Sequence, residues 1–415
     1  MAGAGKLKAP RGTFDVLPDD GQRRRELYRR AGSVLGRYGY RPFEAPVIED
    51  TQLFARGVGE STDIVRKEMF TFEDRGGRSL TLRPEGTAGV CRAYVEHGMH
   101  KLPQPVKLWY WGPFFRHERA QAGRYRQFAQ VGVEALGSDD PSVDAECVLL
   151  LAELLEAAGV HEVRLRLSSL GSVDARTAYL DRLRAYLREH EDRLSEDVRG
   201  RIDANPLRAF DADHEGTQAV MAGAPRLLDS LAGEDADHFA EVRTLLDDAG
   251  VPYEVDPTLV RGLDYYTRTV FEFDSARLGA QSGVGGGGRY DGLIEQLGGP
   301  ATPGVGWAAG IERILLASDG GLGGSPAPVF VAIGDGGGRR EAFGLVTALR
   351  EAGIRAEVEQ AGRSLKGQLK HADRLGAKAV AIVGDGLEWK DMATGEQRSV
   401  TNVQEAVRIA VGLDA

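Results

Sequence analysis

The chain has 415 residues, of which 42% are apolar and 27% are charged, and its formal net charge is -10. At about 150 residues per domain this length predicts two or three domains, and the composition excludes a largely disordered chain. The acidic balance argues against a general nucleic-acid coat, which gains its affinity from many basic groups, but it allows a local site.

The cysteines and histidines give no metal-binding pattern. Two cysteines and eight histidines are scattered along the chain, without the spacing of a zinc site or a disulfide framework. The N-terminal stretch MAGAGKLKAPRG lacks an apolar signal core, and no run reaches the roughly 18 apolar residues that span a membrane. We therefore expect no zinc, no membrane partner and a reducing, cytoplasmic setting.

The first elements follow an antiparallel pattern. Residues 19–40 place Leu27, Ala31, Val34, Leu35 and Tyr38 at helical spacing, and RPFEAPVIED is an extended run interrupted by prolines. SLTLRPEGT predicts a strand and a turn before a helix, while residues 106–119 and 124–137 predict two strands joined by a polar loop. A fold built from repeated βαβ units would instead alternate strands and helices along the chain.

The middle of the chain changes character twice. Residues 171–253 hold charged, helical segments such as ARTAYLDRLRAYLREHEDRL, which predict an inserted helical domain. A strand-like run follows in YYTRTVFEF, whose alternation would place Tyr266, Arg268, Val270 and Glu272 on one face. Charge beside a tyrosine favours a strand that lines a wet pocket, although an ordinary solvated sheet face is the simpler interpretation.

Two glycine-rich stretches come next. GVGGGGRYDGL is neither a phosphate-binding loop of the GxxxxGK[ST] type nor a clean dinucleotide fingerprint. It is consistent with a tight turn between strands, or with close approach of the backbone to a ligand, with Arg289 and Tyr290 at the rim. GVGWAAGIERILLA is expected to begin as a glycine-rich turn and to end as a helix.

A Gly/Pro/Ser linker, GGLGGSPAP, separates the last segment. Beyond it PVFVAI, RAEVEQ and AVAIVG alternate with helical segments at 339–352 and 364–376, which predicts a small α/β domain with a largely parallel sheet. From Pro326 to the end there are twelve Lys or Arg and twelve Asp or Glu, so the net acidity lies in the preceding part.

Arginines and carboxylates near turns and aromatic residues are the candidate chemical groups. Guanidinium groups bind phosphate oxygens bidentately and stay charged at all working pH values, so several of them together favour a polyphosphate site over isolated surface charges. The carboxylates are either their salt-bridge partners or ligands for Mg²⁺ and an amino group. The arginines are Arg83, Arg116, Arg119, Arg124, Arg261 and Arg313, and the carboxylates are Glu85, Glu118, Glu134 and Glu272.

Five stretches in order resemble the class II aminoacyl-tRNA synthetases. FEAPVIED, with Pro46, resembles their motif 1, FFRHERAQAGRYRQFAQVGVEALG resembles motif 2, and GVGWAAGIERILLA resembles motif 3. LVRGLDYYTRTVFEF and GGGGRYDGLIEQLGG, together with TLRPEGTAGV, are similar to signatures of the histidyl-tRNA synthetases. The resemblance covers nearly the whole chain, although the helical insertion and the tail match less tightly.

The resemblance implies an α/β fold, with an α+β catalytic domain built on an antiparallel sheet flanked by helices. Its two parts would be residues 1–170 and 254–320, separated by the helical insertion at 171–253. A linker at 321–328 would lead to an α/β anticodon-binding domain at 329–415. It also implies a homodimer, because motif 1 lies at the dimer interface in this family.

The resemblance further implies a histidine–tRNA ligase. Such an enzyme activates histidine with ATP, releasing pyrophosphate with Mg²⁺, and then transfers histidine to the terminal adenosine of tRNA(His). Arg116 and Arg261 would be catalytic, gripping the α-phosphate from opposite sides. ATP would be bound by Arg116, Glu118, Arg119, Arg124 and Arg313.

The same resemblance assigns the amino-acid and tRNA contacts. Glu85, Thr87 and Gln130 would receive the amino group of histidine, and Glu134, Tyr265, Tyr266 and Tyr290 would surround its imidazole ring. Arg363, Lys366 and Lys370 belong to a basic run in which Ser364 is the predicted N-cap of a helix, and they are predicted either to contact tRNA phosphates or to form a solvated helix face.

Two other functions are compatible with parts of this pattern. A regulatory paralogue from histidine biosynthesis binds histidine without charging tRNA, but it generally lacks the tail domain and parts of the signature. Class II synthetases for threonine, proline, glycine or serine share the general motifs, but RGLDYY and GGRYDGL favour histidine. A kinase that senses uncharged tRNA through a synthetase-like module would need kinase motifs, which the sequence does not show.

Overall fold

The computed structural model describes residues 7–59, 62–119, 123–259, 263–279, 282–322 and 328–414. The chain forms two compact units, divided between Leu322 and Gly323. No helix in these ranges is long and apolar enough to cross a membrane.

An eight-stranded sheet organises the first unit, and most of its neighbouring strands run antiparallel. The short outer strands, one at each edge, pair parallel with their neighbours. In order across the sheet the strands are β1 (Arg41–Pro42), β5 (Val106–Phe115), β6 (Gln127–Leu136), β11 (Gly304–Gly310), β10 (Gly283–Arg289), β9 (Thr267–Ser275), β7 (Val163–Ser169) and β8 (Glu254–Val255).

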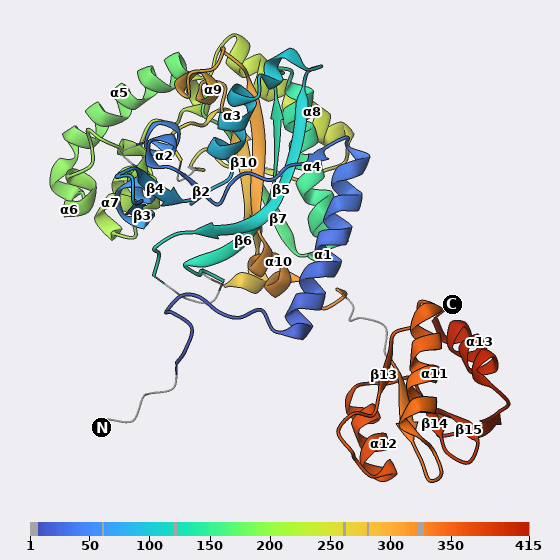
Figure 1. Ribbon diagram of the computed structural model, residues 1–415. Coiled ribbons are helices and arrows are strands. Elements are labelled where there is room, and N and C mark those ends of the chain that lie inside the picture. Colours follow the sequence, from blue (N-terminus) through green and yellow to red (C-terminus); the bar gives the residue numbers. More distant parts are fainter. Residues whose placement is uncertain are drawn as a thin grey trace, which may run out of the picture. The chain divides into compact units, whose positions relative to one another are not determined.

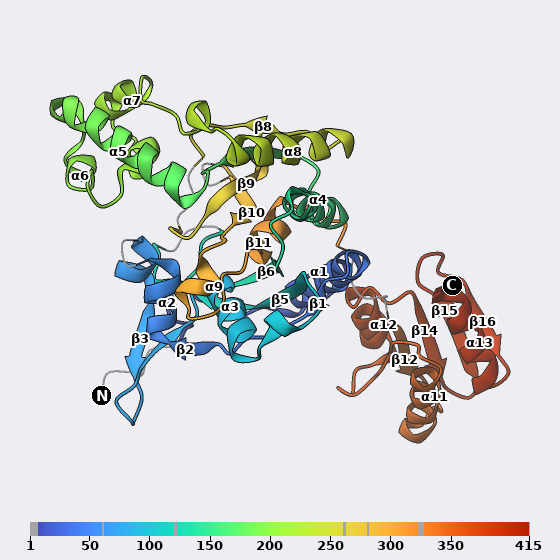
Figure 2. The ribbon, with the colours of Figure 1, turned by 90° about the horizontal axis from the view of Figure 1, so that it is seen from above.

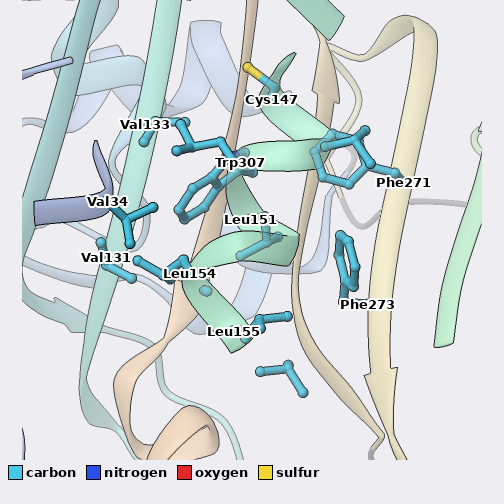
Figure 3. Packing of buried hydrophobic residues seen from close by; sticks show 14 of the residues in the cluster. Val34, Val131, Val133, Cys147, Leu151, Leu154, Leu155, Phe271, Phe273 and Trp307 are labelled. Atoms are coloured by element: carbon cyan, nitrogen blue, oxygen red, sulfur yellow. The ribbon is translucent and has the colours of Figure 1, made fainter. Parts of the chain in front are cut away.

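Three helices cover one face of this sheet. They are α1 (Pro18–Arg37), α4 (Pro141–Ala157) and α8 (Glu234–Asp248), and α4 packs against both of the others. The predicted apolar stripe of α1 is confirmed, because Leu27, Ala31, Val34 and Leu35 are buried. Trp307 of β11 is buried in this core, in one cluster with Val131, Leu151 and Phe271 (Figure 3).

The opposite face of the sheet carries shorter elements, which Figures 1 and 2 show away from α1 and α4. A three-stranded antiparallel sheet, in the order β2, β4, β3, leads into α3. These elements are β2 (Ile48–Asp50), α2 (Thr51–Val58), the π-helical turn Ile64–Glu68, β3 (Phe70–Glu73), β4 (Ser79–Leu82), α3 (Thr87–Glu96), the 3₁₀ turn Met99–Lys101 and α9 (Leu293–Gln296). The 3₁₀ turn Ala276–Leu278 and α10 (Ile311–Ala317) lie instead with the core of α1 and α4, because Ile311, Ile314 and Ala317 are buried in the same cluster as Leu27 and Leu151.

The segment between β7 and β8 is helical, as its charged periodicity predicts. Tyr179, Leu183 and Leu187 of its first helix are buried against the following turns. The elements are α5 (Val173–Glu189), the 3₁₀ turn Glu191–Arg193, α6 (Glu196–Arg199), the 3₁₀ turn Pro206–Asp211, α7 (Glu215–Met221), the 3₁₀ turn Leu228–Ser230 and α8.

The second unit has a five-stranded sheet in the order β13, β12, β14, β15, β16. The prediction of a largely parallel sheet holds for the first three strands only, because β15 and β16 return as antiparallel hairpins. The elements are β12 (Val329–Ile333), α11 (Arg339–Glu351), β13 (Ala356–Val358), α12 (Leu365–Arg374), β14 (Ala379–Val383), β15 (Leu387–Asp391), β16 (Gln397–Val400) and α13 (Val403–Asp414).

The turn interpretation of GVGGGGR and the turn expected at the start of GVGWAAGIERILLA were wrong, whereas the helix expected at the end of the second stretch is confirmed as α10. GVGGGGR forms β10, and GVGWAAG forms β11, where turns were expected. Glycine weakens an isolated strand, but here β10 and β11 pair with each other inside the sheet and gain ladder hydrogen bonds on both sides. Tertiary pairing therefore overrides the local propensity.

Candidate functional site

A cavity of about 240 Å³ lies on the face of the sheet opposite the core formed with α1 and α4. It is lined from β5, β6, β9, β10 and β11, and from segments that precede α3 and β9. Nine of the predicted site residues line it: Glu85, Thr87, Arg116, Glu118, Arg124, Gln130, Tyr265, Tyr266 and Arg313.

The alternation of β6 explains which side chains reach this cavity. Val131 and Val133 point into the core with α4, so Gln130 and Glu134 project to the opposite face. Gln130 lines the cavity, and its Oε1 atom is a buried acceptor with no hydrogen-bond donor among the described residues. A buried acceptor of this kind suits an N–H group of a ligand.

Glu134 is completely buried and is held by three hydroxyl groups. The Thr87 hydroxyl donates to Oε1 over 2.8 Å, the Tyr110 hydroxyl donates to Oε1 over 3.3 Å, and the Tyr290 hydroxyl donates to Oε2. Burial raises the pKa of Glu134 to about 8, although these hydrogen bonds act in the opposite direction. The group is therefore a carboxyl whose proton can be held or lost near neutral pH.

A second buried carboxylate begins the helix α3. Glu85 accepts hydrogen bonds from the backbone N–H groups of Thr87 at 2.7 Å and Ala88 at 3.0 Å, which would otherwise be unsatisfied in the first turn. Burial raises the pKa of Glu85, and these backbone bonds oppose that shift. The helix N-terminus thus fixes the carboxylate at the cavity wall.

Three tyrosines form one aromatic cluster beside Glu134. The ring centroids of Tyr265 and Tyr266 are 4.8 Å apart, and those of Tyr265 and Tyr290 are 5.6 Å apart, both in edge-to-face geometry. All three rings are buried. Together with Glu134 they make this end of the site apolar in its walls and polar only at a few fixed points.

Glycines leave the space that these large side chains occupy. A Cβ atom at Gly132 or at Gly86 would overlap the ring of Tyr110, and one at Gly306 would overlap the carboxyl of Glu134. Tyr110 stands directly across from Gly132 in the β5–β6 register. Glycine at positions 86, 132 and 306 is therefore required by packing against Tyr110 and Glu134.

The other end of the cavity is cationic and more open. Arg116 donates from Nε to the carbonyl oxygen of Pro84 over 2.8 Å, which leaves the far side of its guanidinium turned to the cavity. Arg124 lies 3.3 Å from Glu118, and its side chain is 42% exposed. Arg313 lies in the first turn of the helix α10 on the same wall, where burial lowers its pKa and the charge of Arg124 adds to that effect.

Several predicted residues lie elsewhere. Glu134 and Tyr290 are not among the residues that line the cavity, but they contact Thr87, Tyr110 and Tyr265, which do. Arg261 is outside the described residues, and Arg119 is exposed and does not line the cavity. Arg83 is buried outside the cavity, where its guanidinium donates to the carbonyl oxygens of Ala45 and Pro113 and stacks on the Phe114 ring. Its inclusion in the polyphosphate constellation was wrong, because its donors are used by the backbone.

The rim position expected for Arg289 was also wrong. Its side chain is completely buried and binds the carboxylate of Asp144 on α4, the carbonyl oxygen of Ser138 and Asp291. A buried arginine needs such compensation, and the preceding glycine run gave no sign that α4 would supply a carboxylate.

The predicted alternation of the strand that becomes β9 is interrupted. Tyr266 and Glu272 line the cavity, but Arg268 has a left-handed φ of 47° next to an irregularity in the β9–β10 register. The extra residue turns the Arg268 side chain away to an ion pair with Asp235. Periodicity counted from the sequence cannot detect such a bulge.

Sequence reasoning missed several lining residues. Tyr110, Phe128 and Glu312 line the cavity, as does the Trp307 position, although the Trp307 side chain packs into the core on the other face. Glu312 also accepts a hydrogen bond from the backbone N–H of Ala129 at 3.0 Å. Tyr110 could have been found, since it lies on a strand predicted to pair with the one that carries Glu134. Trp307 had no comparable signal, because its glycine-rich surroundings did not predict a strand.

In the second unit, Lys366 and Lys370 are exposed and lie one turn apart on α12. The predicted N-cap is confirmed, because the Ser364 hydroxyl accepts a hydrogen bond from the N–H of Gly367. Arg363 lies 3.2 Å from the buried carboxylate of Glu359, so part of its charge is already compensated.

Comparisons with known proteins agree with this geometry. A family model described as histidyl-tRNA synthetase matches residues 12–314, and one described as anticodon binding domain matches residues 329–410. The chain is 48% identical to the histidine–tRNA ligase of Desulforamulus reducens, covering 94% of this chain and 96% of that protein. For the ligase of Rubrobacter xylanophilus the identity is 48%, with 95% and 96% covered.

A solved structure is similar over the same length. The crystal structure of apo histidyl-tRNA synthetase from S. aureus matches with a TM-score of 0.81 and 36% identity, covering 98% of this chain and all of that chain. The fold and the matches define an aminoacyl-tRNA synthetase. Within that class, the chain belongs to the histidyl-tRNA synthetase family, since the family model spans most of its length. The fold class predicted from the sequence is confirmed.

Because the chain is 48% identical to histidine–tRNA ligases over nearly its whole length, the comparisons also show its activity. The reaction is the ATP-driven ligation of histidine to tRNA, through histidyl adenylate, and not the non-catalytic role of the regulatory paralogue. The predictions of an enzyme and of a histidine–tRNA ligase are confirmed.

The raised pKa of Glu134 predicts a specific pH dependence of stability. The folded chain holds this proton up to about pH 8, whereas the unfolded chain loses it near pH 4.5. Between these values the folded state binds more protons, so this group's contribution to the free energy of unfolding falls as pH rises, by up to roughly 1.4 kcal/mol per pH unit. Glu134→Gln removes the titration.

Thermal unfolding of both proteins, without histidine, at pH 5.5, 6.5 and 7.5 measures this difference. We expect the unfolding temperature of the wild type to fall relative to that of Glu134→Gln as pH rises. Parallel curves for the two proteins would show that Glu134 is already ionised at the lowest pH.

Proposed function

We propose that the cavity holds both substrates of adenylate formation, with histidine at the buried Glu134 end and the ATP phosphates at the arginine end. The observation that carries this proposal is the polarity of one continuous cavity. At one end the cavity is lined by Thr87 and Tyr110, whose hydroxyl groups hold the completely buried Glu134 carboxyl, and at the other end it is lined by three arginines. Histidine has a small polar ring that suits the buried end, whereas the triphosphate is highly charged and suits the arginine end.

At the histidine end, the fixed groups match the amino acid. Glu85, Thr87 and Gln130 receive the ammonium group, which the carboxylate and the unsatisfied Gln130 oxygen support. Glu134 and Tyr266 address the two ring nitrogens, with Tyr265 and Tyr290 as close neighbours. A side chain without ring nitrogens would leave buried polar groups unpaired, which is the strong form of discrimination.

At the nucleotide end, Arg116 binds the α-phosphate and Arg313 binds the γ-phosphate and flanks the adenine. Glu118 and Arg124 complete the ATP contacts from the cavity wall, with Arg124 at the outer phosphates, and Arg119, which is exposed outside the wall, is assigned to ATP by the family resemblance alone. The openness around Arg124 supports that position, because pyrophosphate has to leave from this side. Arg261 approaches the α-phosphate opposite Arg116.

The chemistry then needs no side-chain nucleophile. A carboxylate oxygen of histidine attacks the α-phosphorus, the bond to the bridging oxygen of pyrophosphate breaks, and two guanidinium groups stabilise the negative charge on the equatorial oxygens. In the second step the terminal adenosine hydroxyl of tRNA(His) attacks the histidyl carbonyl and releases AMP. Catalysis rests on positioning and charge stabilisation.

Mg²⁺ would accompany ATP and would neutralise charge on its outer phosphates. The described residues contain no group of three or more His, Cys, Asp or Glu side chains placed to hold a metal ion. Glu118 and Glu272 line the cavity and suit a cation bound mainly by phosphate oxygens.

The remaining organisation is also a proposal. It comprises a class II catalytic domain in two parts, 1–170 and 254–320, the helical insertion 171–253, the linker 321–328 and the anticodon-binding domain 329–415. We further propose a cytoplasmic homodimer with motif 1 at its interface. Sedimentation equilibrium would test the dimer, and a monomer at micromolar concentration would contradict it.

The exposed pair Lys366 and Lys370, with Arg363, contacts tRNA phosphates beside the anticodon. Their separation of one helical turn supports a shared phosphate-facing surface. Charge-removing variants should weaken tRNA binding and reduce its salt dependence, and an unchanged salt slope would contradict the contact.

Glu134→Ala tests the histidine end. We expect ATP–pyrophosphate exchange to depend on histidine alone among the amino acids in the wild type, and this variant to lose it by at least about 100-fold, since about 3 kcal/mol of discrimination is involved. ATP binding, measured by equilibrium dialysis, should be retained. Exchange that persists at low histidine concentration would exclude Glu134 from the ring contact.

Arg261→Ala tests the second α-phosphate contact. We expect the rate of adenylate formation in single-turnover experiments to fall by roughly 100-fold or more, because one transition-state donor is lost. The Kd for histidine should stay within about twofold of the wild-type value. A weaker Kd with an unchanged rate would reverse the assignment.

A further inference from the structure

The two tyrosines beside Glu134 stand on a short irregular segment. Residues 263–266 precede β9, so sheet hydrogen bonds do not fix them. Tyr265 and Tyr266 nevertheless are buried and line the cavity. Their backbone must therefore be held by some other part of the molecule.

Arg176, on the first helix of the segment between β7 and β8, provides that support. Its Nη1 atom donates to the backbone carbonyl oxygens of both Asp264 and Tyr266, each at 2.9 Å. These two carbonyls flank Tyr265. Burial lowers the pKa of Arg176, so the side chain has exchanged water for these backbone acceptors.

The neighbouring residue Arg268 makes a second tie to the same helical segment. Its backbone N–H donates to the carbonyl oxygen of Gly171, and its own carbonyl accepts from Leu170, both at 2.7 Å. Its side chain lies 3.2 Å from Asp235 on α8, which also accepts from the N–H of Ser172. The left-handed backbone at Arg268 is thus held from three directions.

The hydrogen bonds of Arg176 are connected to Glu134 through contacts within the aromatic cluster. Arg176 fixes the backbone on both sides of Tyr265, whose ring contacts the rings of Tyr266 and Tyr290. The Tyr290 hydroxyl in turn donates to Glu134. A change in the position of the segment at Asp264 to Tyr266 would therefore move the walls around the imidazole.

We propose that Arg176 is a positioning residue for histidine binding, which couples the helical segment 173–248 to the amino-acid end of the site. This inference rests on the proposed role of Tyr265, Tyr266 and Glu134 in binding histidine. Arg176 does not line the cavity, so its effect on the substrate is indirect.

The test compares Arg176→Met, Arg176→Lys and the control Arg226→Met in ATP–pyrophosphate exchange. Arg226 is a half-buried arginine of the same helical segment that donates to the carbonyl of Met221, so its loss perturbs the segment without touching residues 264–268. We expect Arg176→Met to raise the KM for histidine about tenfold, which is the loss of about 1.4 kcal/mol, with the KM for ATP within about twofold. Arg176→Lys, which keeps a cationic donor, should recover part of this change.

An unchanged KM for histidine in Arg176→Met would overturn the inference, and so would an equal increase in Arg226→Met, which would indicate general loosening of the segment. If Arg176→Met does not fold, as judged by circular dichroism, the comparison of Arg176→Lys with Arg226→Met decides, and equal KM values would overturn it. Tyr266→Phe in the same assay separates the proposed histidine site from the proposed positioning role of Arg176. An unchanged KM for histidine in Tyr266→Phe would contradict the histidine site itself. A raised KM in Tyr266→Phe together with an unchanged KM in Arg176→Met would contradict only the positioning role.

Discussion

The burial of one carboxyl group, that of Glu134, constrains the whole site. A carboxyl without water has to be neutral or fully hydrogen-bonded, and here three hydroxyl groups from α3, β5 and the turn after β10 converge on it. Those three elements are distant in sequence. Their meeting at Glu134 requires the strand order β5, β6, β11, β10 across the sheet.

Space around this carboxyl comes from the absence of side chains. Tyr110 and Glu134 fit only because glycine occupies positions 86, 132 and 306, of which Gly306 lies on the glycine-rich strand β11. The glycines of β10 make room for the neighbouring strand instead, because a Cβ atom at Gly285 would overlap Ala309 and one at Gly287 would overlap the carbonyl oxygen of Gly306. These glycines give β10 and β11 a weak intrinsic propensity to form strands. Pairing on both sides, and the packing of Trp307 into the core on the other face, offset that weakness.

Much of this arrangement could be predicted from the sequence. The apolar stripe of α1, the paired strands around residues 106–137 and the helical character of residues 173–248 follow from local periodicity, and the family signatures located nine cavity residues. What failed depends on contacts between distant segments. Arg289 is buried because α4 brings Asp144 to it, and Arg268 leaves the strand face because a bulge intervenes. Neither the contact with Asp144 nor the bulge can be predicted from the residues next to Arg289 and Arg268 in the sequence.

The two ends of the cavity differ in their exposure to water, and this difference fits a division of labour. The exposed fraction rises from 0% at Glu134 to 42% for the side chain of Arg124. Unpaired polar groups are expensive only where water cannot reach them, so selection between amino acids is strongest at the dry end. Phosphates carry full charges that arginine can hold in a wetter environment, and an open side lets a charged product depart. Since the dry end is built partly from residues tied to the helical segment, its selectivity depends on structure outside the sheet as well as on the residues that line it.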